Sequence, residues 1–297
     1  MNLRTMKNRL KSVLPKRLNS QIVFYKNHHR FINAKAPELL DEKLLLLMEQ
    51  YADDPHIKSL VDKYAVRSYL EKAGYASLLN ELYQVCDSPE EINWGRLPDK
   101  YVVKCNHGSG YNIIVQDASR LDRDDAMRKL KKWMSEDYGR VSGERQYCGI
   151  PRKILVEKYL ESEDGHFPPD YKFFVSYGKV LGCLLVVERD TARKLIYVDT
   201  DFNDLGFMHE YTKPDYKKFK PASWEQQVKV AAQLGKDFPL VRVDLYDQDG
   251  KILFGELTFT SNGGICNYFS MDGQSYIGQR IAFPDKNSLK TRAGKAV

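Results

Sequence analysis

The segment Arg242–Phe259, RVDLYDQDGKILFGELTF, carries the residues whose types and spacing most directly suggest chemistry. Alternation along the first of two strand patterns places Arg242 and Asp244 on one face. It likewise places Glu256 and Thr258 together on the second strand. If the strands pair around the Asp-Gly turn, the two carboxylates come close and repel each other unless a cation lies between them. Such oxygen ligands suit Mg²⁺ that bridges substrate phosphates; the alternative is a hairpin with solvated polar faces.

A glycine loop follows a lysine in the segment 102–115, VVKCNHGSGYNIIV. One strand delivers Lys104, a Gly-Ser-Gly turn follows, and a second strand begins. Glycines let backbone N–H groups approach an anion, and the lysine adds a positive charge. In a Walker A motif the loop opens a helix and the lysine comes after it, so this arrangement is a different one. A phosphate-binding loop and an ordinary hairpin with glycine at its tip both fit this segment.

The apolar strand pattern Ile154–Leu160 ends in Glu157 and Lys158 and runs into further acidic residues. The backbone of such a strand end can hold an adenine, and a later carboxylate can reach the ribose hydroxyls. The alternative is a strand that runs into an acidic surface loop.

The elements that must position these residues can be predicted from their spacing. Short β-branched or aromatic runs predict strands at 101–105, 112–115, 154–159, 171–176, 180–187, 240–246 and 252–259. Helices are predicted at 37–51, 57–73 and 122–134, and after Ser223, which forms a capping-box pattern with Gln226. Hairpin links at 177–179 and 247–250 mean antiparallel strands, so the predicted fold class is α+β and not a doubly wound parallel sheet.

Composition narrows the protein class. The chain has 297 residues, of which 42% are hydrophobic and 29% charged, which excludes long disorder, collagen-like repeats and coiled coils. The longest purely apolar run, Leu44 to Met48, is far shorter than the roughly 20 residues of a membrane-spanning helix. The five cysteines are widely spread and predict neither a metal site nor a redox pair. Because no secretory signal pattern is found either, a cytoplasmic protein is expected.

The N-terminal segment is strongly basic. Residues 1–37 contain nine Lys or Arg and no acidic residue, which leaves −3 of the net +6 for the rest of the chain. Apolar residues at helical spacing from Leu3 to Leu14 predict a basic amphipathic helix. Such a helix either packs on the body of the protein or, through residues 1–18, contacts an anionic membrane at its inner face. No nucleic-acid-binding motif accompanies the charge, so nucleic acid is not an expected partner.

Taken in order, these segments resemble the ATP-grasp superfamily, and more narrowly its teichuronopeptide-biosynthesis (TupA-type) branch. The resemblance covers roughly residues 35–270. It rests on DKYAVRSYL, LPDKYVVKCNHGSGYNII, PDYKFFVSYGKV and RVDLYDQDGKILFGELTF. It implies two α+β lobes with antiparallel sheets that enclose ATP.

The resemblance also implies roles for individual residues. ATP would be bound by Lys63, Lys104, His107, Gly108, Ser109, Gly110, Glu157, Lys158, Leu160 and Asp164, the last as ribose partner. Mg²⁺ would be held by Asp244, Glu256 and Thr258. The catalytic group would be Arg242, Lys172 and Arg189, and the substrate would meet Asp170 and Asn262. Lys172 stands where related ligases have arginine, and so it lacks the planar fork of a guanidinium group.

Two departures from the superfamily pattern bear on function. The last strand reads Glu256–Leu257–Thr258 where most members have Glu-x-Asn, which puts a second metal in doubt. Only about 60 residues precede Asp62, too few for the usual N-terminal substrate domain, so acceptor recognition is expected from the N-terminal helices, from the segment 260–297 or from another protein. The predicted organisation is a basic helical region at 1–60, an ATP-grasp domain at 61–270 and a basic tail at 271–297. Within the domain, the nucleotide lobe is expected at about 100–160 and the metal lobe at 165–270.

The resemblance implies an ATP-dependent ligase that joins a carboxylate to an amine through an acyl phosphate. Because the branch occurs in pathways that build surface polysaccharides, the expected acid is a sugar (uronic acid) carboxylate, and the expected amine is an amino acid or small amine. One alternative is a metal-dependent glycosyltransferase that uses Asp199–Thr200–Asp201 on a sugar nucleotide. Another is a binding protein that keeps the fold without catalysis, which Thr258 motivates.

Overall fold

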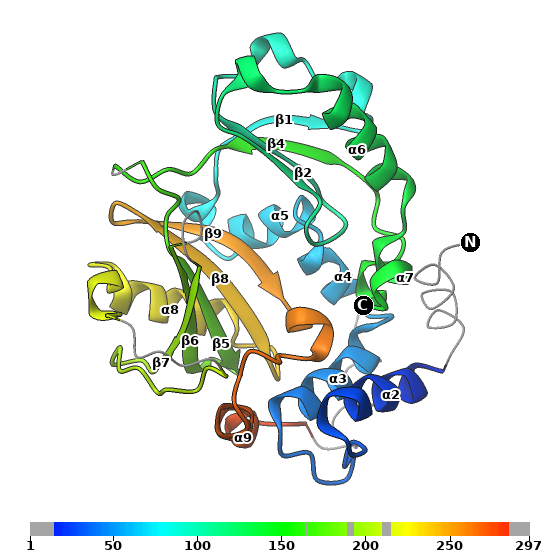
Figure 1. Cartoon of the computed structure of the whole chain (residues 1–297), viewed down its shortest axis with the longest axis vertical. Coiled ribbons are helices and arrows are strands. Elements are labelled where there is room, and N and C mark those ends of the chain that lie inside the picture. The colour runs from blue at the N-terminus through cyan, green and yellow to red at the C-terminus, as the bar shows by residue number, and fades with distance from the viewer. Residues whose placement is uncertain (1–14, 164, 189–192, 210–214, 285–297) are drawn as a thin grey trace.

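The computed structural model describes residues 15–163, 165–188, 193–209 and 215–284. Two antiparallel sheets form its frame, a four-stranded sheet in the order β1-β4-β2-β3 and a five-stranded sheet in the order β7-β6-β5-β8-β9 (Figure 1). The strands are β1 (Leu82–Cys86), β2 (Tyr101–Cys105), β3 (Asn112–Val115), β4 (Ile154–Lys158), β5 (Asp170–Ser176), β6 (Lys179–Val187), β7 (Lys194–Val198), β8 (Val241–Gln248) and β9 (Lys251–Thr258). This mixed architecture with two antiparallel sheets confirms the predicted fold class.

Helices cover and connect the two sheets. They are α2 (Lys16–His28), α3 (Leu40–Tyr51), α4 (Pro55–Val61), α5 (Ala65–Lys72), α6 (Arg123–Ser135), α7 (Tyr138–Ser142), α8 (Trp224–Leu234) and α9 (Met271–Arg280). In Figure 1, α4 and α5 lie between the two sheets, α6 lies beside the smaller sheet, and α8 lies beside the larger one. The helices α2, α3 and α9 pack together at the other side of the molecule. None of the helices within the described ranges is long and apolar enough to cross a membrane.

The two hairpin turns of the larger sheet confirm the predicted pairing. Tyr177 and Gly178 link β5 to β6, and Asp249 and Gly250 link β8 to β9, all four with positive φ. Two-residue turns of this kind match the right-handed twist of the flanking strands. The β8–β9 turn therefore fixes the register that decides which side chains meet in the site.

Three predictions about local structure were wrong. The helix expected at 57–73 is broken into α4 and α5, because Asp62 turns the chain and accepts hydrogen bonds from the backbone N–H groups of Tyr64 and Ala65. The Ser223 hydroxyl donates to Asp247 and makes no capping bond with α8. Strand β1 was not predicted; most of its residues are half-buried or exposed, so the apolar signal is weak.

The apolar core is divided among three clusters. The largest joins both faces of the larger sheet to α3, α4, α5, α8 and α9. A second lies in the smaller sheet with Leu130 of α6, and a third joins α2 to α3 around Phe24. The N-terminal helix α3 and the C-terminal helix α9 thus share one core with the larger sheet. Together these clusters hold two sheets at a fixed distance on either side of the α4–α5 junction.

Candidate active site

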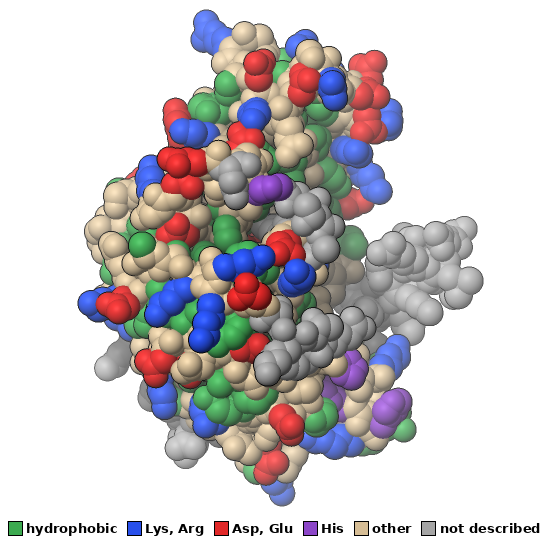
Figure 2. Space-filling view, turned by 60° about the vertical axis from the view of Figure 1, so that its left-hand side comes forward, with side chains coloured by type: hydrophobic (Ala, Val, Ile, Leu, Met, Phe, Trp, Pro, Cys, Tyr) green, Lys and Arg blue, Asp and Glu red, His purple; other side chains and the backbone are tan. Residues whose placement is uncertain are grey.

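A cavity of about 360 Å³ opens between the two sheets. Charged side chains from both sheets and from α5 line it: Lys63, Arg67, Lys104, Glu157, Asp170, Lys172, Asp244 and Glu256. Ser109, Gly110 and Leu160 lie on its wall as well. Figure 2 shows side chains of both charges gathered near the middle of one face of the molecule. Most of the predicted site residues that the structure describes are therefore brought together in one place.

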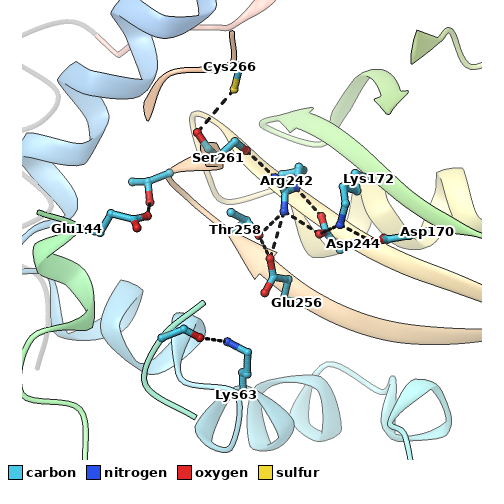
Figure 3. A network of polar contacts seen from close by, with 12 residues as sticks. Lys63, Glu144, Asp170, Lys172, Arg242, Asp244, Glu256, Thr258, Ser261 and Cys266 are labelled. Carbon is cyan, nitrogen blue, oxygen red and sulfur yellow. Dashed lines mark hydrogen bonds and ion pairs between the residues drawn. The ribbon is translucent and has the colours of Figure 1, made fainter. Parts of the chain in front are cut away.

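The β8–β9 hairpin brings two carboxylates into register. Asp244 pairs with Glu256 across the strands, and a bulge at Gly255 then shifts the pairing by one residue. Arg242 bridges the two carboxylates: its Nε lies 2.7 Å from Asp244 Oδ1, and its Nη2 lies 2.8 Å from Asp244 Oδ2 and 3.2 Å from Glu256 Oε1 (Figure 3). The cation that the sequence required between the acids is thus supplied by the same strand.

A second cation, the partly buried Lys172 of β5, lies between a carboxylate oxygen of Asp170 and the Asp244 oxygen that Arg242 Nη2 also contacts. Its Nζ is 2.6 Å from Asp170 Oδ2 and 2.5 Å from Asp244 Oδ2. Burial alone would lower the pKa of Lys172, but the two carboxylates raise it above its ordinary value. Lys172 therefore stays charged, and its ammonium group is fixed by the sheet.

Glu256 is the most strongly shifted carboxylate of the site. Burial would raise its pKa, but Lys63, Arg242 and Lys172 together outweigh burial and lower it to about 2. The hydroxyl of Thr258 also donates to Glu256 Oε1 at 2.5 Å. Glu256 is thus an anion throughout the physiological pH range.

Lys63 reaches the cavity from the junction between α4 and α5. Its backbone N–H donates to the carbonyl of Asn106, and its Nζ donates to the carbonyl of Gly108 at 2.5 Å. The Asn106 amide group in turn donates to Asp62, which turns the chain at this junction. Burial lowers the pKa of Lys63, and Glu256 opposes that shift. The break in the predicted helix is therefore what places this lysine beside the glycine loop.

The glycine loop between β2 and β3 is held by aromatic side chains. The Tyr138 ring covers Gly108 so closely that an added Cβ would lie 2.7 Å from Tyr138 Cγ. Tyr111 stacks on Trp133 with ring centroids 5.3 Å apart and meets the edge of Tyr138. His107 was predicted to bind ATP, but its side chain is buried and donates to the Trp133 carbonyl, so it supports the loop from behind. Ser109 and Gly110 are exposed at the cavity.

Lys104 and Glu157 form an ion pair on the smaller sheet, with Nζ 2.7 Å from Oε2. The two strands that carry them are neighbours, and Glu157 pairs with Val102, two residues from the lysine. Burial would raise the pKa of Glu157, but Lys104 outweighs this effect and lowers it. The ammonium group that is expected to meet phosphate is thus oriented by a buried carboxylate.

The comparisons with known proteins agree with this arrangement. A model of the family described as TupA-like ATPgrasp matches residues 42–282. The chain belongs to the TupA-like ATP-grasp family. ATP-grasp proteins form a class of ATP-dependent ligases that make amide bonds, and the predicted family is confirmed. A search of curated proteins finds no match.

Several solved structures share a partial likeness with this ATP-grasp chain. D-alanine–D-alanine ligase from Bacillus anthracis, complexed with ATP, is 17% identical with a TM-score of 0.40; the match covers 68% of this chain and 54% of that chain. The ATP-grasp ligase PsnB, complexed with minimal precursor, Mg and ADP, is 15% identical with a TM-score of 0.39, and the coverage is 73% and 58%. L-amino acid ligase from Bacillus licheniformis is 16% identical with a TM-score of 0.43, and the coverage is 78% and 50%. This chain thus spans between half and three fifths of the length of these structures.

The expected ATP-grasp hinge follows β4. Leu160 lines the cavity, whereas the Lys158 side chain is exposed. The Lys158 N–H donates to the carbonyl of Glu81, and its own carbonyl accepts from the Asn80 side chain. An adenine bound here would share that carbonyl with Asn80. Asp164 and Arg189, predicted as ribose partner and catalytic residue, lie outside the described residues.

The donor set of this ATP-grasp site fits a metal at Glu256. Its side chain is 33% exposed, and its Oε2 has no protein partner among the described residues, whereas Oε1 accepts from Arg242 and Thr258. Carboxylate and phosphate oxygens are what Mg²⁺ prefers. The protein alone supplies no cluster of three or more His, Cys, Asp or Glu ligands within the described ranges, so phosphate oxygens would complete the coordination.

Sequence reasoning missed a buried network that joins α7 and the residues after it to the residues that follow β9. Glu144, which follows α7, accepts from Thr260 Oγ1 at 2.5 Å and from the Tyr138 hydroxyl at 3.2 Å. Gln146 donates to the same threonine, and the next residue, Ser261, accepts from Arg242 at 3.3 Å. Burial raises the pKa of Glu144. These residues carry no motif, and only the tertiary structure shows that they meet.

Two other residues that the sequence singled out make hydrogen bonds within local turns of the backbone. The Asn262 amide group donates to the Ile265 carbonyl at 2.6 Å, and the residue has a positive φ, so it shapes the loop after β9. Asp199, proposed for a glycosyltransferase, accepts from the backbone of Asp201 and Asn203. Its carboxylate therefore caps a turn, and it does not line the cavity.

Proposed function

We propose that this protein is an ATP-dependent carboxylate–amine ligase that forms an amide through an acyl phosphate. The observation that carries the proposal is one cavity in which Lys63 and Lys104 face the hairpin of Arg242, Asp244 and Glu256. Lysines and a glycine loop suit the triphosphate, and the cations Arg242 and Lys172 on the larger sheet suit the phosphoryl group in transit. Four of the five cysteines are buried free thiols, and the reaction needs no thiol nucleophile.

The chain's own residues would act in two steps. In the first, a substrate carboxylate oxygen attacks the γ-phosphorus, the bond to the β–γ bridging oxygen breaks, and ADP leaves. In the second, the amine nitrogen attacks the acyl carbon, phosphate leaves with the C–O bond pair, and the nitrogen loses a proton to solvent or phosphate. Arg242 and Lys172 would stabilise the charge on the phosphoryl oxygens in both steps, and Lys63 and Lys104 would hold the β- and γ-phosphates. Bound Mg²⁺ at Glu256 would supply Lewis-acid stabilisation of the phosphate oxygens.

We infer that the acid is a uronic acid and that the product enters a surface polysaccharide, with an amino acid or small amine as the second substrate. What supports this assignment is membership in the TupA-like family. The reaction class itself depends on the site and would hold for any acid that presents its carboxylate beside Arg242 and Lys172.

The experiment follows the carboxylate oxygen. The wild-type protein is incubated with MgATP, an amino acid panel and galacturonate or glucuronate labelled with ¹⁸O in the carboxylate. A ligase that works through an acyl phosphate moves one ¹⁸O atom into inorganic phosphate, and this transfer requires both acid and amine. Release of unlabelled phosphate without acid dependence would overturn the proposal. Lys100→Met is the matched control for Lys104→Met. Lys100 directly precedes β2, the strand that carries Lys104, and it pairs with Glu161 outside the cavity.

An anionic membrane remains the proposed partner of the N-terminal region, and α2 supports this proposal. Leu18, Ile22 and Tyr25 follow one another at i, i+4 and i+7, and Tyr25 stacks on the exposed Phe31 with ring centroids 5.1 Å apart. No acidic residue lies between Pro15 and Pro37. An exposed apolar ridge with basic neighbours suits a lipid surface that carries negative charge.

The membrane proposal is tested by sedimentation with vesicles of phosphatidylglycerol and phosphatidylcholine. Binding is expected to be lost on deletion of residues 1–18 and to weaken severalfold with Phe31→Ser, whereas Ile114→Ser, at another exposed apolar position on the smaller sheet, should have no effect. If deletion of 1–18 leaves both vesicle binding and activity unchanged, the membrane proposal is wrong.

The alternative of a nucleotide-binding protein without catalysis is favoured by one observation, Thr258 in place of the usual asparagine. Metal-dependent release of ADP would exclude it. Binding of MgATP without turnover on any acid–amine pair would favour it.

A further inference from the structure

The sequence motif predicts Asp244 as a metal ligand, but its carboxylate oxygens are already used by other contacts. The residue is 1% exposed, and both carboxylate oxygens already accept charged donors. Oδ1 accepts from Arg242 Nε at 2.7 Å, and Oδ2 accepts from Arg242 Nη2 at 2.8 Å and from Lys172 Nζ at 2.5 Å (Figure 3). Three of about four lone-pair sites on this carboxylate are therefore used by cations of the protein.

A divalent cation at Asp244 would compete with Lys172. Mg²⁺ binds carboxylate oxygens at about 2.1 Å, and it would lie within a few ångströms of two positive groups that hold the same oxygens. Lys172 is also held by Asp170 Oδ2 at 2.6 Å, so displacing its ammonium group would break two ion pairs at once, those with Asp170 and with Asp244. The ammonium group and a metal are thus alternatives at this position.

Glu256 presents the opposite case. Its side chain is one-third exposed at the cavity, and no described residue contacts its Oε2. Thr258 gives its hydroxyl hydrogen to Glu256 and accepts from Arg242 at 3.0 Å, so this side chain too is engaged within the hairpin. One metal position, at Glu256, is therefore open, and the position that Asp244 and residue 258 would form is closed.

We propose that the nucleotide-bound protein takes one divalent cation, held by Glu256 and the phosphates, and that Lys172 fills the place of a second. This inference rests on the proposed function, because it assumes that ATP occupies the cavity. It assigns Asp244 a positioning role: the carboxylate fixes Lys172 and Arg242 toward the phosphoryl group. It also explains how a strand that ends in threonine can serve a phosphoryl transfer.

The test counts metal ions and does not depend on turnover. Mn²⁺ is titrated into the full-length protein with saturating adenylyl imidodiphosphate, free Mn²⁺ is measured by EPR, and bound nucleotide is measured by equilibrium dialysis of the same sample. The expected result is one Mn²⁺ per bound nucleotide in wild type. Lys172→Met should raise this ratio to two, and Lys172→Met with Thr258→Asn should tighten the second site at least tenfold. Lys194→Met is the control: Lys194 is the first residue of β7, and it pairs with Glu188. The ratio of Mn²⁺ to bound nucleotide in this variant should stay at one.

The outcomes separate the two proposals. Two Mn²⁺ per nucleotide in wild type, or a ratio of one in folded Lys172→Met, overturns the inference and leaves the ligase proposal standing. No nucleotide binding by wild type overturns both. If Lys172→Met does not fold, the wild-type ratio alone decides, since one supports the inference and two rejects it.

Discussion

The ion pair of Lys104 and Glu157 is expected both to stabilise the fold and to orient a lysine toward phosphate. The Lys104→Met variant leaves Glu157, which is 7% exposed, without its cation, so we expect the free energy of unfolding to fall by about 2 kcal/mol at pH 7. The pKa of Glu157 is lowered in the folded protein from 4.5, so this contribution is present above pH 4.5 and is lost as the pH falls through the folded-state value. Urea denaturation should therefore show a deficit that shrinks as the pH falls below 4.5 and through the lowered pKa of Glu157; a deficit independent of pH would contradict this account. Lys100→Met should change stability little.

The role of Glu256 can be tested by a substitution that removes only its charge. Because its pKa is about 2, the carboxylate is ionised throughout the range from pH 5 to 9, and the activity profile in that range should show no step from this residue. Glu256→Gln keeps the side-chain shape and removes the charge, so we expect kcat/KM for MgATP to fall at least about 100-fold. Steady-state release of ADP measures this fall. An unchanged dependence of activity on Mg²⁺ concentration in Glu256→Gln would count against a direct metal contact.

At the scale of single residues, the sequence predicts which charged side chains meet better than it predicts which residues surround them. The alternation in β8 and β9 correctly placed Asp244 beside Glu256, because the turn fixes the register. His107 was predicted at the nucleotide, yet its ring faces Trp133, because the aromatic residues of a distant helix decide which way it points. Glu144 could not be predicted at all, since its partner Thr260 lies 116 residues away.

The glycine loop acts as an element whose conformation depends on α7. A Cβ at residue 108 would lie 2.7 Å from the Tyr138 ring, so Gly108→Ala must shift the loop and weaken the Lys63 contact to its carbonyl. We expect KM for ATP to rise about tenfold with a smaller change in kcat. Tyr138→Ala removes the Cγ and Cδ2 atoms that the new Cβ would meet, so it should relieve the clash in the double variant, which a double-mutant cycle would detect as non-additivity. Gly95→Ala, where the nearest atom is 3.6 Å away, is the control.

The elements themselves were predicted where pattern and turn agree. Seven strands lie within about a residue or two of the predicted ranges, because each alternates or is fully buried and ends at a turn residue. The break between α4 and α5 was not predicted, since Asp62 and Lys63 look like ordinary helix positions until Asn106 supplies the tertiary contact. Asp122, in contrast, caps α6 as expected, because that bond is local.

Helix α9 depends on close contact with α3. A Cβ at Gly278 would lie 2.0 Å from the Glu38 carbonyl oxygen and 2.7 Å from the backbone nitrogen of Leu40. Because backbone cannot move aside as a side chain does, we expect Gly278→Ala to reduce the free energy of unfolding by about 3 kcal/mol. Chemical denaturation measures the change against Gly95→Ala. A loss below about 0.5 kcal/mol would mean that α9 does not pack on α3 as described.

Across the whole molecule, charge balance explains why a triphosphate would need a divalent cation here. The described residues that line the cavity include four cations, Lys63, Arg67, Lys104 and Lys172, and four carboxylates, Glu157, Asp170, Asp244 and Glu256. Such a cavity has no net charge to offset the negative charge of ATP. MgATP carries half the charge of free ATP, so it suits a neutral cavity better, and the same balance explains why one metal suffices if Lys172 serves as a fixed cation.

Binding between two sheets makes a prediction about the molecule as a whole. A nucleotide held by the loop of β2–β3 on one side and by the β8–β9 hairpin on the other would add a further link to those that α4, α5 and the Glu144–Thr260 contact already make. Adenylyl imidodiphosphate with Mg²⁺ should therefore slow amide hydrogen exchange at least about tenfold both in residues 105–111 and in β9. Exchange in α3 and α9 should stay unchanged, because none of their residues lines the cavity. Protection confined to one sheet would mean that the nucleotide does not bridge them, and Glu256→Gln should produce that one-sided pattern, since it removes the contact on the larger sheet and leaves Lys104 in place.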